Sequence, residues 1–184
     1  GMTAAELAYE ILIENDGNNF IYAPLVNYAD HTFGVCKKML DDKNAIMGLG
    51  DGGAHVGFIL DAGYPTWLIS YWSVKQKAYS MEETVRRLTS DTANAAGLND
   101  RGLLKVGLKA DINIIDWENV GSSDPFMTQD LPAGGKRLMQ YTKGYVTTIV
   151  SGKVTYKNGK FTKERPGTVV KSVKDEEKTL EFIN

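Results

Sequence analysis

Two short apolar runs, each preceded by a helical pattern, limit the first half of this chain to a small set of folds. The runs cover residues 19–26 (NFIYAPLV) and 45–49 (AIMGL), and the helical patterns cover residues 3–14 and 32–40. A short run that is apolar throughout is typical of a strand buried on both faces of a parallel sheet. The alternation of helix and strand therefore predicts parallel α/β structure.

The helices of the first half carry clear start and stop signals. Thr3 and Glu6 form a capping box at the first helix. Pro65 suits the first turn of a helix in the middle of the chain. A second capping box, Ser80 with Glu83, predicts one further helix that reaches residue 96 and is closed by a glycine.

After residue 100 the pattern changes to the alternation expected of strands. Residues 103–104 and 110–116 read as strands, and residues 118–136 as a polar loop. A β-meander comes next, over residues 145–161, in which Asn158-Gly159 is the sharpest hairpin signal. We place a domain boundary near residues 98–101.

Length and composition exclude several classes of protein. The chain has 184 residues, whereas a complete (β/α)₈ barrel typically needs about 250. Its 21 basic and 23 acidic residues are interspersed, so we expect no nucleic-acid partner. One cysteine and two histidines exclude an intrachain disulfide and a three-histidine zinc site made by this chain alone. No apolar run reaches the roughly 20 residues that cross a bilayer, and without a signal-peptide pattern we expect a cytoplasmic protein.

The second apolar run ends abruptly in a glycine-rich segment, Gly48-Leu-Gly-Asp-Gly-Gly53. This segment matches the G-x-G-x-x-G pattern of dinucleotide sites, but the acidic residue expected about 20 positions later is missing. Asp51 stands at the carboxyl end of the predicted strand, where catalytic groups collect in parallel α/β folds. A carboxylate there can hold a metal or move a proton, and it can equally be a turn residue that accepts bonds from backbone N–H groups.

Several segments resemble one enzyme family. The segment Gly50-Asp-Gly-Gly-Ala-His-Val-Gly57 resembles the end of barrel strand 8 in amidohydrolases of the N-acyl-D-amino-acid deacylase (D-aminoacylase-like) group. Asn27-Tyr-Ala-Asp30 and the helix around Glu83–Ala93 look like the same group. Residues 100–116 and 150–159 are similar to the small β-domain of amidohydrolases.

The resemblance implies a partial (β/α) barrel followed by a small β-domain of the amidohydrolase composite type. Residues 1–98 are the C-terminal part of the barrel, residues 99–170 the β-domain, and residues 171–184 a charged tail. It also implies a hydrolase of C–N bonds in which zinc, or another divalent metal, activates water. The substrate class is an N-acyl amino acid or a related amide.

The site residues carried over from the family are few. Asp51 is the expected catalytic proton shuttle and a possible metal contact, and His55, Gly52 and Gly53 are the expected substrate contacts. The family's H-x-H and its later metal-binding histidines have no counterpart here. We therefore expect this chain alone to bind no metal and to be inactive, as the C-terminal fragment of a longer enzyme.

Two other functions remain open from the residues alone. One is a stand-alone structural or interaction module, and the other is a nucleotide-binding module at Gly48–Gly53. If the earlier barrel strands are missing, the apolar strand at residues 19–26 exposes a parallel edge, which predicts a homo-oligomer.

The remaining chemistry-bearing residues have simpler interpretations. His31 lies where a helix begins and favours a surface or cap position. For His55, a hydrogen bond within its own loop competes with substrate contact. Cys36 lies on an apolar helical stripe and reads as an inert core residue. Trp67, Tyr71 and Trp72 stand at helical spacing, which is more typical of a core than of a ligand platform.

Overall fold

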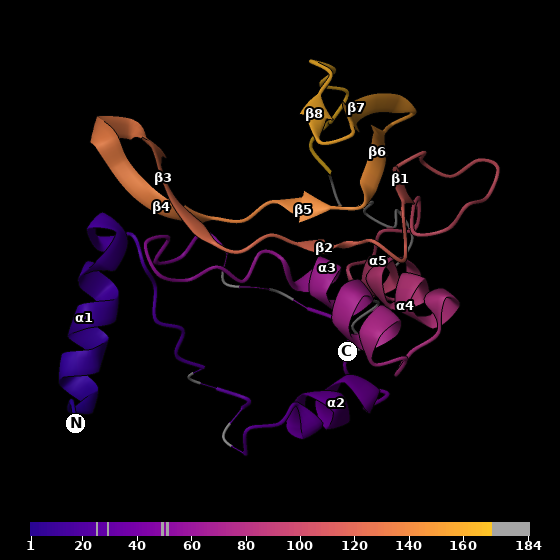
Figure 1. The fold of residues 1–184 in the computed structure, drawn as a ribbon. Helices are drawn as coiled ribbons and strands as arrows, with labels where there is room; N and C mark the ends of the chain where they lie inside the picture. Colours follow the sequence, from indigo (N-terminus) through magenta and orange to yellow (C-terminus); the bar gives the residue numbers. More distant parts are fainter. Residues whose placement is uncertain (25, 29, 49, 51, 171–184) are drawn as a thin grey trace, which may run out of the picture. The chain divides into compact units, whose positions relative to one another are not determined.

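The computed structural model describes residues 1–170 apart from 25, 29, 49 and 51 (Figure 1). The chain divides into two units. The first unit comprises Gly1–Met47, Asp51–Ala62 and Asp124–Gln140. The second comprises Gly48–Gly50, Gly63–Ser123 and Tyr141–Asn184. The domain boundary predicted near residues 98–101 separates the expected barrel part from the expected β-domain, and it stays a prediction.

Two helices of the first unit confirm the sequence patterns. Helix α1 is Ala4–Gly17, and both halves of its capping box form: the Glu6 N–H donates to Thr3 Oγ1 and the Thr3 N–H to the Glu6 carboxylate. The backbone bond from Thr3 holds the pKa of Glu6 below its ordinary value. The regular turns of α1 end where Asn15 and Asp16 take positive φ angles of 52° and 54°. Helix α2 is Gly34–Asp41.

The strand predicted over residues 19–26 is not formed in the described part of that run. Residues 19–24 and 26 lie outside any strand, and Tyr22 and Val26 are 87% and 76% exposed. Residues 45–48 of the second apolar run are likewise irregular. A parallel strand needs backbone partners, and every strand pairing among the described residues is antiparallel. The prediction of a fold that mixes helices and strands is confirmed. The prediction of these two parallel strands is wrong for the described residues.

The polar loop predicted over residues 118–136 is also wrong, because it contains most of a hairpin. Strand β3 (Phe126–Leu131) pairs antiparallel with β4 (Gly135–Met139) through the short turn η2 (Pro132–Gly134). Ala133 and Gly134 take positive φ angles, which reverse the chain between the strands.

The second unit contains the helices of the middle of the chain. Pro65 stands in the first turn of α3 (Tyr64–Trp67), as predicted, and the chain continues as the wider π-helix η1 (Leu68–Lys75). The single helix predicted after Ser80 is two helices, α4 (Met81–Leu88) and α5 (Ser90–Ala95). They separate at Thr89, whose hydroxyl donates to the Val85 carbonyl at 2.6 Å. Such side-chain bonding to the preceding turn competes with the regular helix.

The hydrophobic core of the described residues lies in this unit. Its apolar members are less than a tenth exposed: Leu68, Ile69, Trp72, Tyr79, Ala93 and Val120. Thr84 is fully buried and satisfies its hydroxyl on the Ser80 carbonyl at 2.8 Å. The Arg87 guanidinium lies over the Tyr79 ring, 4.5 Å from its centre, and pairs with Glu83. The first unit has no buried residue among those described.

A four-stranded antiparallel sheet of order β1-β6-β7-β8 completes the second unit (Figure 1). Its strands are β1 (Ile112–Ile115), β6 (Tyr145–Val150), β7 (Lys153–Lys157) and β8 (Lys160–Phe161). Asn158 and Gly159 both take positive φ, 48° and 74°, which confirms the predicted hairpin turn. Strands β2 (Gly121–Ser122) and β5 (Thr142–Lys143) form a separate short pair. Residues 103–104 are not a strand, and their leucines are 59% and 86% exposed.

The segment that resembles the amidohydrolase β-domain is held by charge pairs and a turn. Arg101 contacts the carboxylates of Asp100 at 2.8 Å and Asp111 at 3.3 Å. The other oxygen of Asp111 accepts the Ser151 N–H at 2.8 Å, at the tip of the β6–β7 hairpin. These bonds give Asp100, Arg101 and Asp111 a structural role in this segment. None of the described helices is long and apolar enough to cross a membrane.

Candidate functional site

The predicted catalytic residue, Asp51, lies outside the described residues, and the site is built from the loop on its C-terminal side. Residues 52–62 form this loop, which has no helix or strand. A Cβ atom on Gly52 would lie 2.8 Å from the Cβ of Ala62, so the two ends of the loop touch where only glycine fits. Gly53 takes a φ of 108°, which residues other than glycine rarely adopt. Both glycines are therefore explained by the path of the backbone.

His55 organises the far side of the same loop. Its φ is 47°, and its carbonyl accepts the N–H groups of Phe58 and Ile59 at 3.0 and 3.1 Å. Its exposed imidazole stacks on the Phe58 ring with centroids 5.2 Å apart. The loop thus uses the backbone and one ring face of His55, and its substrate role stays a prediction.

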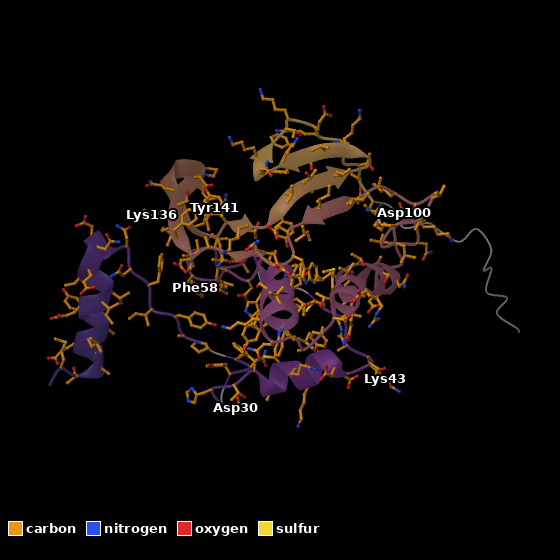
Figure 2. All side chains as sticks on the ribbon, turned by 45° about the vertical axis from the view of Figure 1, so that its right-hand side comes forward. Asp30, Lys43, Phe58, Asp100, Lys136 and Tyr141 are labelled. Carbon is orange, nitrogen blue, oxygen red and sulfur yellow. The ribbon has the colours of Figure 1, made fainter. Side chains whose placement is uncertain are left out.

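The β3–β4 hairpin supplies the neighbour of this loop that the sequence interpretation missed. The Leu138 N–H donates to the Val56 carbonyl at 2.8 Å, so β4 runs beside the loop (Phe58 on the loop and Lys136 on β4 are labelled in Figure 2). Leu138 and Val56 are 82 positions apart in the sequence. The available signal was the weak apolar alternation on both sides of Pro132-Ala-Gly-Gly135.

An ion pair joins the two strands of that hairpin. The Arg137 guanidinium donates from Nε and Nη2 to the two oxygens of Asp130, both at 2.7 Å. This two-bond geometry is the strongest arrangement available to a guanidinium and a carboxylate. The hydrogen bonds from Arg137 lower the pKa of Asp130, and those to Asp130 raise the pKa of Arg137.

The Asn27–Asp30 segment, which resembles the family, is used locally in the structure. The Asp30 carboxylate accepts the hydroxyl of Thr32 at 2.9 Å and its N–H at 3.2 Å, which lowers the pKa of Asp30. His31 is exposed with a φ of 58° and precedes α2 by three residues. The half-buried Cys36 directs its thiol to the Asn27 carbonyl at 3.4 Å. The core position predicted for Cys36 is wrong, because no residue of α2 is buried.

The aromatic residues of the middle helices form a cluster. Trp67 and Tyr71 stack with centroids 4.6 Å apart, and Trp72 meets both rings edge-on. Trp72 is buried as expected, while Trp67 and Tyr71 are half-buried. Two surface hollows of about 710 and 870 Å³ occur in the described residues, and neither is lined by the Gly52–Ala62 loop.

Two expected ligands can be compared with the residues present. Within residues 1–170 without the four gaps, no three histidine, cysteine, aspartate or glutamate side chains come together as a metal site. The donor set of a catalytic metal is thus not offered by these residues. For a dinucleotide, residues 45–48 form no strand and no helix begins within residues 52–63, so the described segments lack the strand–turn–helix context of that site.

Comparison with known proteins places the chain in a family. A dihydroorotase from Lactobacillus acidophilus is 33% identical over 89 residues, which are 46% of this chain and 20% of the relative. The chain therefore spans about a fifth of the length of this curated relative. No solved structure gives a significant match. The model of the Amidohydrolase family matches residues 23–156, which include the Gly52–Ala62 loop and strands β1 to β7 except the end of β7, so the chain belongs to the Amidohydrolase family.

Proposed function

We propose that this sequence is the C-terminal part of a metal-dependent hydrolase of C–N bonds, with N-acyl amino acids or related amides as substrates. The family match over residues 23–156 supports the reaction class. The likeness of Gly50–Gly57 to the deacylase group supports the substrate class. The family match favours an enzyme over a stand-alone interaction module. We also propose that the enzyme is cytoplasmic.

Asp51 is the proposed catalytic residue. Amide hydrolysis at neutral pH needs a strong nucleophile and a proton for a poor leaving group. A carboxylate at this position accepts the proton of the attacking water and returns it to the departing nitrogen. Zinc, or another divalent metal, is proposed as the cofactor of the longer protein, and the described residues of this chain do not supply its ligands.

The loop after Asp51 is the proposed substrate contact. His55 and Phe58 present a stacked pair of rings at the surface of this loop. Gly52 and Gly53 leave backbone groups without side-chain cover on the residues next to Asp51. Apolar contact with the rings and hydrogen bonds to the backbone suit an amide that carries an apolar side chain.

Replacing Asp51 by asparagine in the longer enzyme tests the proposal. We expect Asp51→Asn to lower kcat by about three orders of magnitude or more, since a shuttle group acts in the transition state. Circular dichroism and the thermal midpoint should stay those of the parent, because Asn keeps the size of the side chain. Asp61→Asn, on the same loop, is the matched control. An unchanged kcat in Asp51→Asn would indicate that Asp51 is a turn residue without a catalytic role.

A second candidate comes from the curated relative. The dihydroorotase match covers 46% of this chain, so a dihydroorotase-like activity is the alternative substrate preference. Assaying the longer enzyme on dihydroorotate and on a panel of N-acetyl amino acids separates the two. A higher kcat/KM on dihydroorotate would replace the deacylase proposal.

A further inference from the structure

The Gly52–Ala62 loop has few internal restraints for a loop that carries a candidate active site. Its internal contacts include the Gly52–Ala62 approach, the two amide bonds to the His55 carbonyl and the stack of the His55 and Phe58 rings. None of its described residues is buried, so apolar packing contributes little to its conformation. A loop of this kind needs a backbone partner from another element to keep one conformation.

Strand β4 provides that partner from a distant part of the sequence. Leu138 faces Met127 of β3 in the hairpin register, and its N–H bonds to Val56 of the loop. In an antiparallel pair, successive residues direct their N–H groups alternately toward and away from the partner strand. The N–H of Leu138 therefore points away from β3, and the loop lies at the open edge of β4 at this point.

An ion pair also joins the two strands of the hairpin next to this bond, where the strand register shifts between Thr128 and Leu131. Arg137, the residue before Leu138, is fixed on Asp130 of β3 by two hydrogen bonds of 2.7 Å. The bidentate pair restricts both the spacing and the twist of the strands. A restraint on β3–β4 is thus passed to the loop through one backbone hydrogen bond.

We infer that the β3–β4 hairpin is a positioning element of the candidate active site, acting through the Leu138–Val56 bond. Leu138 and Arg137 are positioning residues: they fix the loop on the C-terminal side of Asp51 and take no part in the chemistry. We call the Leu138–Val56 hydrogen bond the tether. Its expected effect on catalysis rests on the proposed function, whereas the restraint that it places on the loop does not. Small displacements of catalytic groups lower kcat more than they change substrate binding.

To test the proposal, the backbone N–H group of Leu138 is removed. Leu138→Pro deletes the N–H, and proline is tolerated at edge positions whose N–H faces away from the sheet. Leu138→Ala removes most of the side chain and keeps the N–H, so it is the matched control. Hydrogen exchange by NMR on the full chain reports the loop through the amides of Phe58 and Ile59, which bond to His55.

We expect these two amides to exchange at least tenfold faster in Leu138→Pro than in Leu138→Ala. In the longer enzyme, Leu138→Pro should reduce kcat about tenfold to a hundredfold below Leu138→Ala, with KM changed less than threefold. Equal exchange of Phe58 and Ile59 in the two variants overturns the tether. Faster exchange with equal kcat overturns the positioning role. Absence of any hydrolysis in the parent enzyme overturns the proposed function instead, and the exchange comparison still decides the tether.

Discussion

Gly144 shows how a single residue can be required by its surroundings as well as by its backbone angle. Its φ is 86°, and a Cβ there would lie 2.6 Å from Cα and 2.9 Å from N of Val120, a buried residue. Its carbonyl accepts the Asp116 N–H at 2.7 Å. The glycine therefore lets β6 begin directly against the segment that leads into β2.

We expect Gly144→Ala to lower the free energy of unfolding by about 2–4 kcal/mol, through both the backbone strain and the steric overlap. Gly152→Ala is the matched control, because Gly152 has a similar φ of 76° and nothing within 4 Å of its added Cβ. The strain alone should cost the control about 1 kcal/mol. Urea unfolding followed by circular dichroism measures both, and equal losses would show that the Val120 contact is unimportant.

At the scale of elements, the stability of the β3–β4 hairpin is expected to depend on pH. Hydrogen bonds from Arg137 lower the pKa of Asp130 in the folded hairpin, so protonation favours the open hairpin. The stabilisation is present above the ordinary aspartate pKa of about 3.9 and is lost as the pH falls through that value toward the lower folded one.

A carboxyl titration by NMR checks this dependence. In Arg137→Gln the pKa of Asp130 should rise toward the ordinary aspartate value, because the hydrogen bonds that lower it are removed. Lys136→Gln removes the neighbouring positive charge and should shift it less, since Lys136 makes no ion pair with another described residue. A pKa of Asp130 that is the same in Arg137→Gln and in the parent contradicts the prediction.

For the whole molecule, we expect the isolated chain to lack both zinc and turnover. The sequence has two histidines and one cysteine, and the described residues bring no three metal-binding side chains together. The checks are elemental analysis of protein purified with zinc present and release of amino acids from N-acetyl amino acids. Stoichiometric zinc, with turnover that Asp51→Asn abolishes, would contradict this expectation.

Self-association of the chain remains a prediction, now on a different basis. The parallel edge expected at residues 19–26 is absent from the described residues, but the first unit exposes many large apolar side chains. Those at least 42% exposed are Met2, Leu7, Tyr9, Leu12, Ile13, Phe20, Ile21, Tyr22, Val26, Val35, Met39, Ile46 and Phe58. Exposed apolar surface on this scale favours association.

Light scattering at low micromolar concentration measures the mass directly. A dimer or larger species is expected, against a chain mass of 20.3 kDa. Replacing two exposed apolar residues of α1, Leu7→Ser with Leu12→Ser, should shift the population toward the monomer. A monomer in the parent chain would show that the first unit covers its own apolar surface.

Local signals determined the elements whose partners are close in sequence. The Thr3–Glu6 capping box, Pro65 in the first turn of α3 and the Asn158-Gly159 turn each act within a few residues, and each has the predicted result. Such interactions involve only neighbouring backbone and side-chain groups, so the sequence contains all the information that they need.

Tertiary structure decided the elements that depend on distant partners. The apolar run at residues 19–26 has strand composition but no parallel neighbour in the described residues, while residues 126–139 form a hairpin with only a weak pattern. The bond from Leu138 to Val56 joins segments that no local signal connects. A strand is stable only when another strand satisfies its N–H and C=O groups, and which segment does so is settled by the packing of the whole unit.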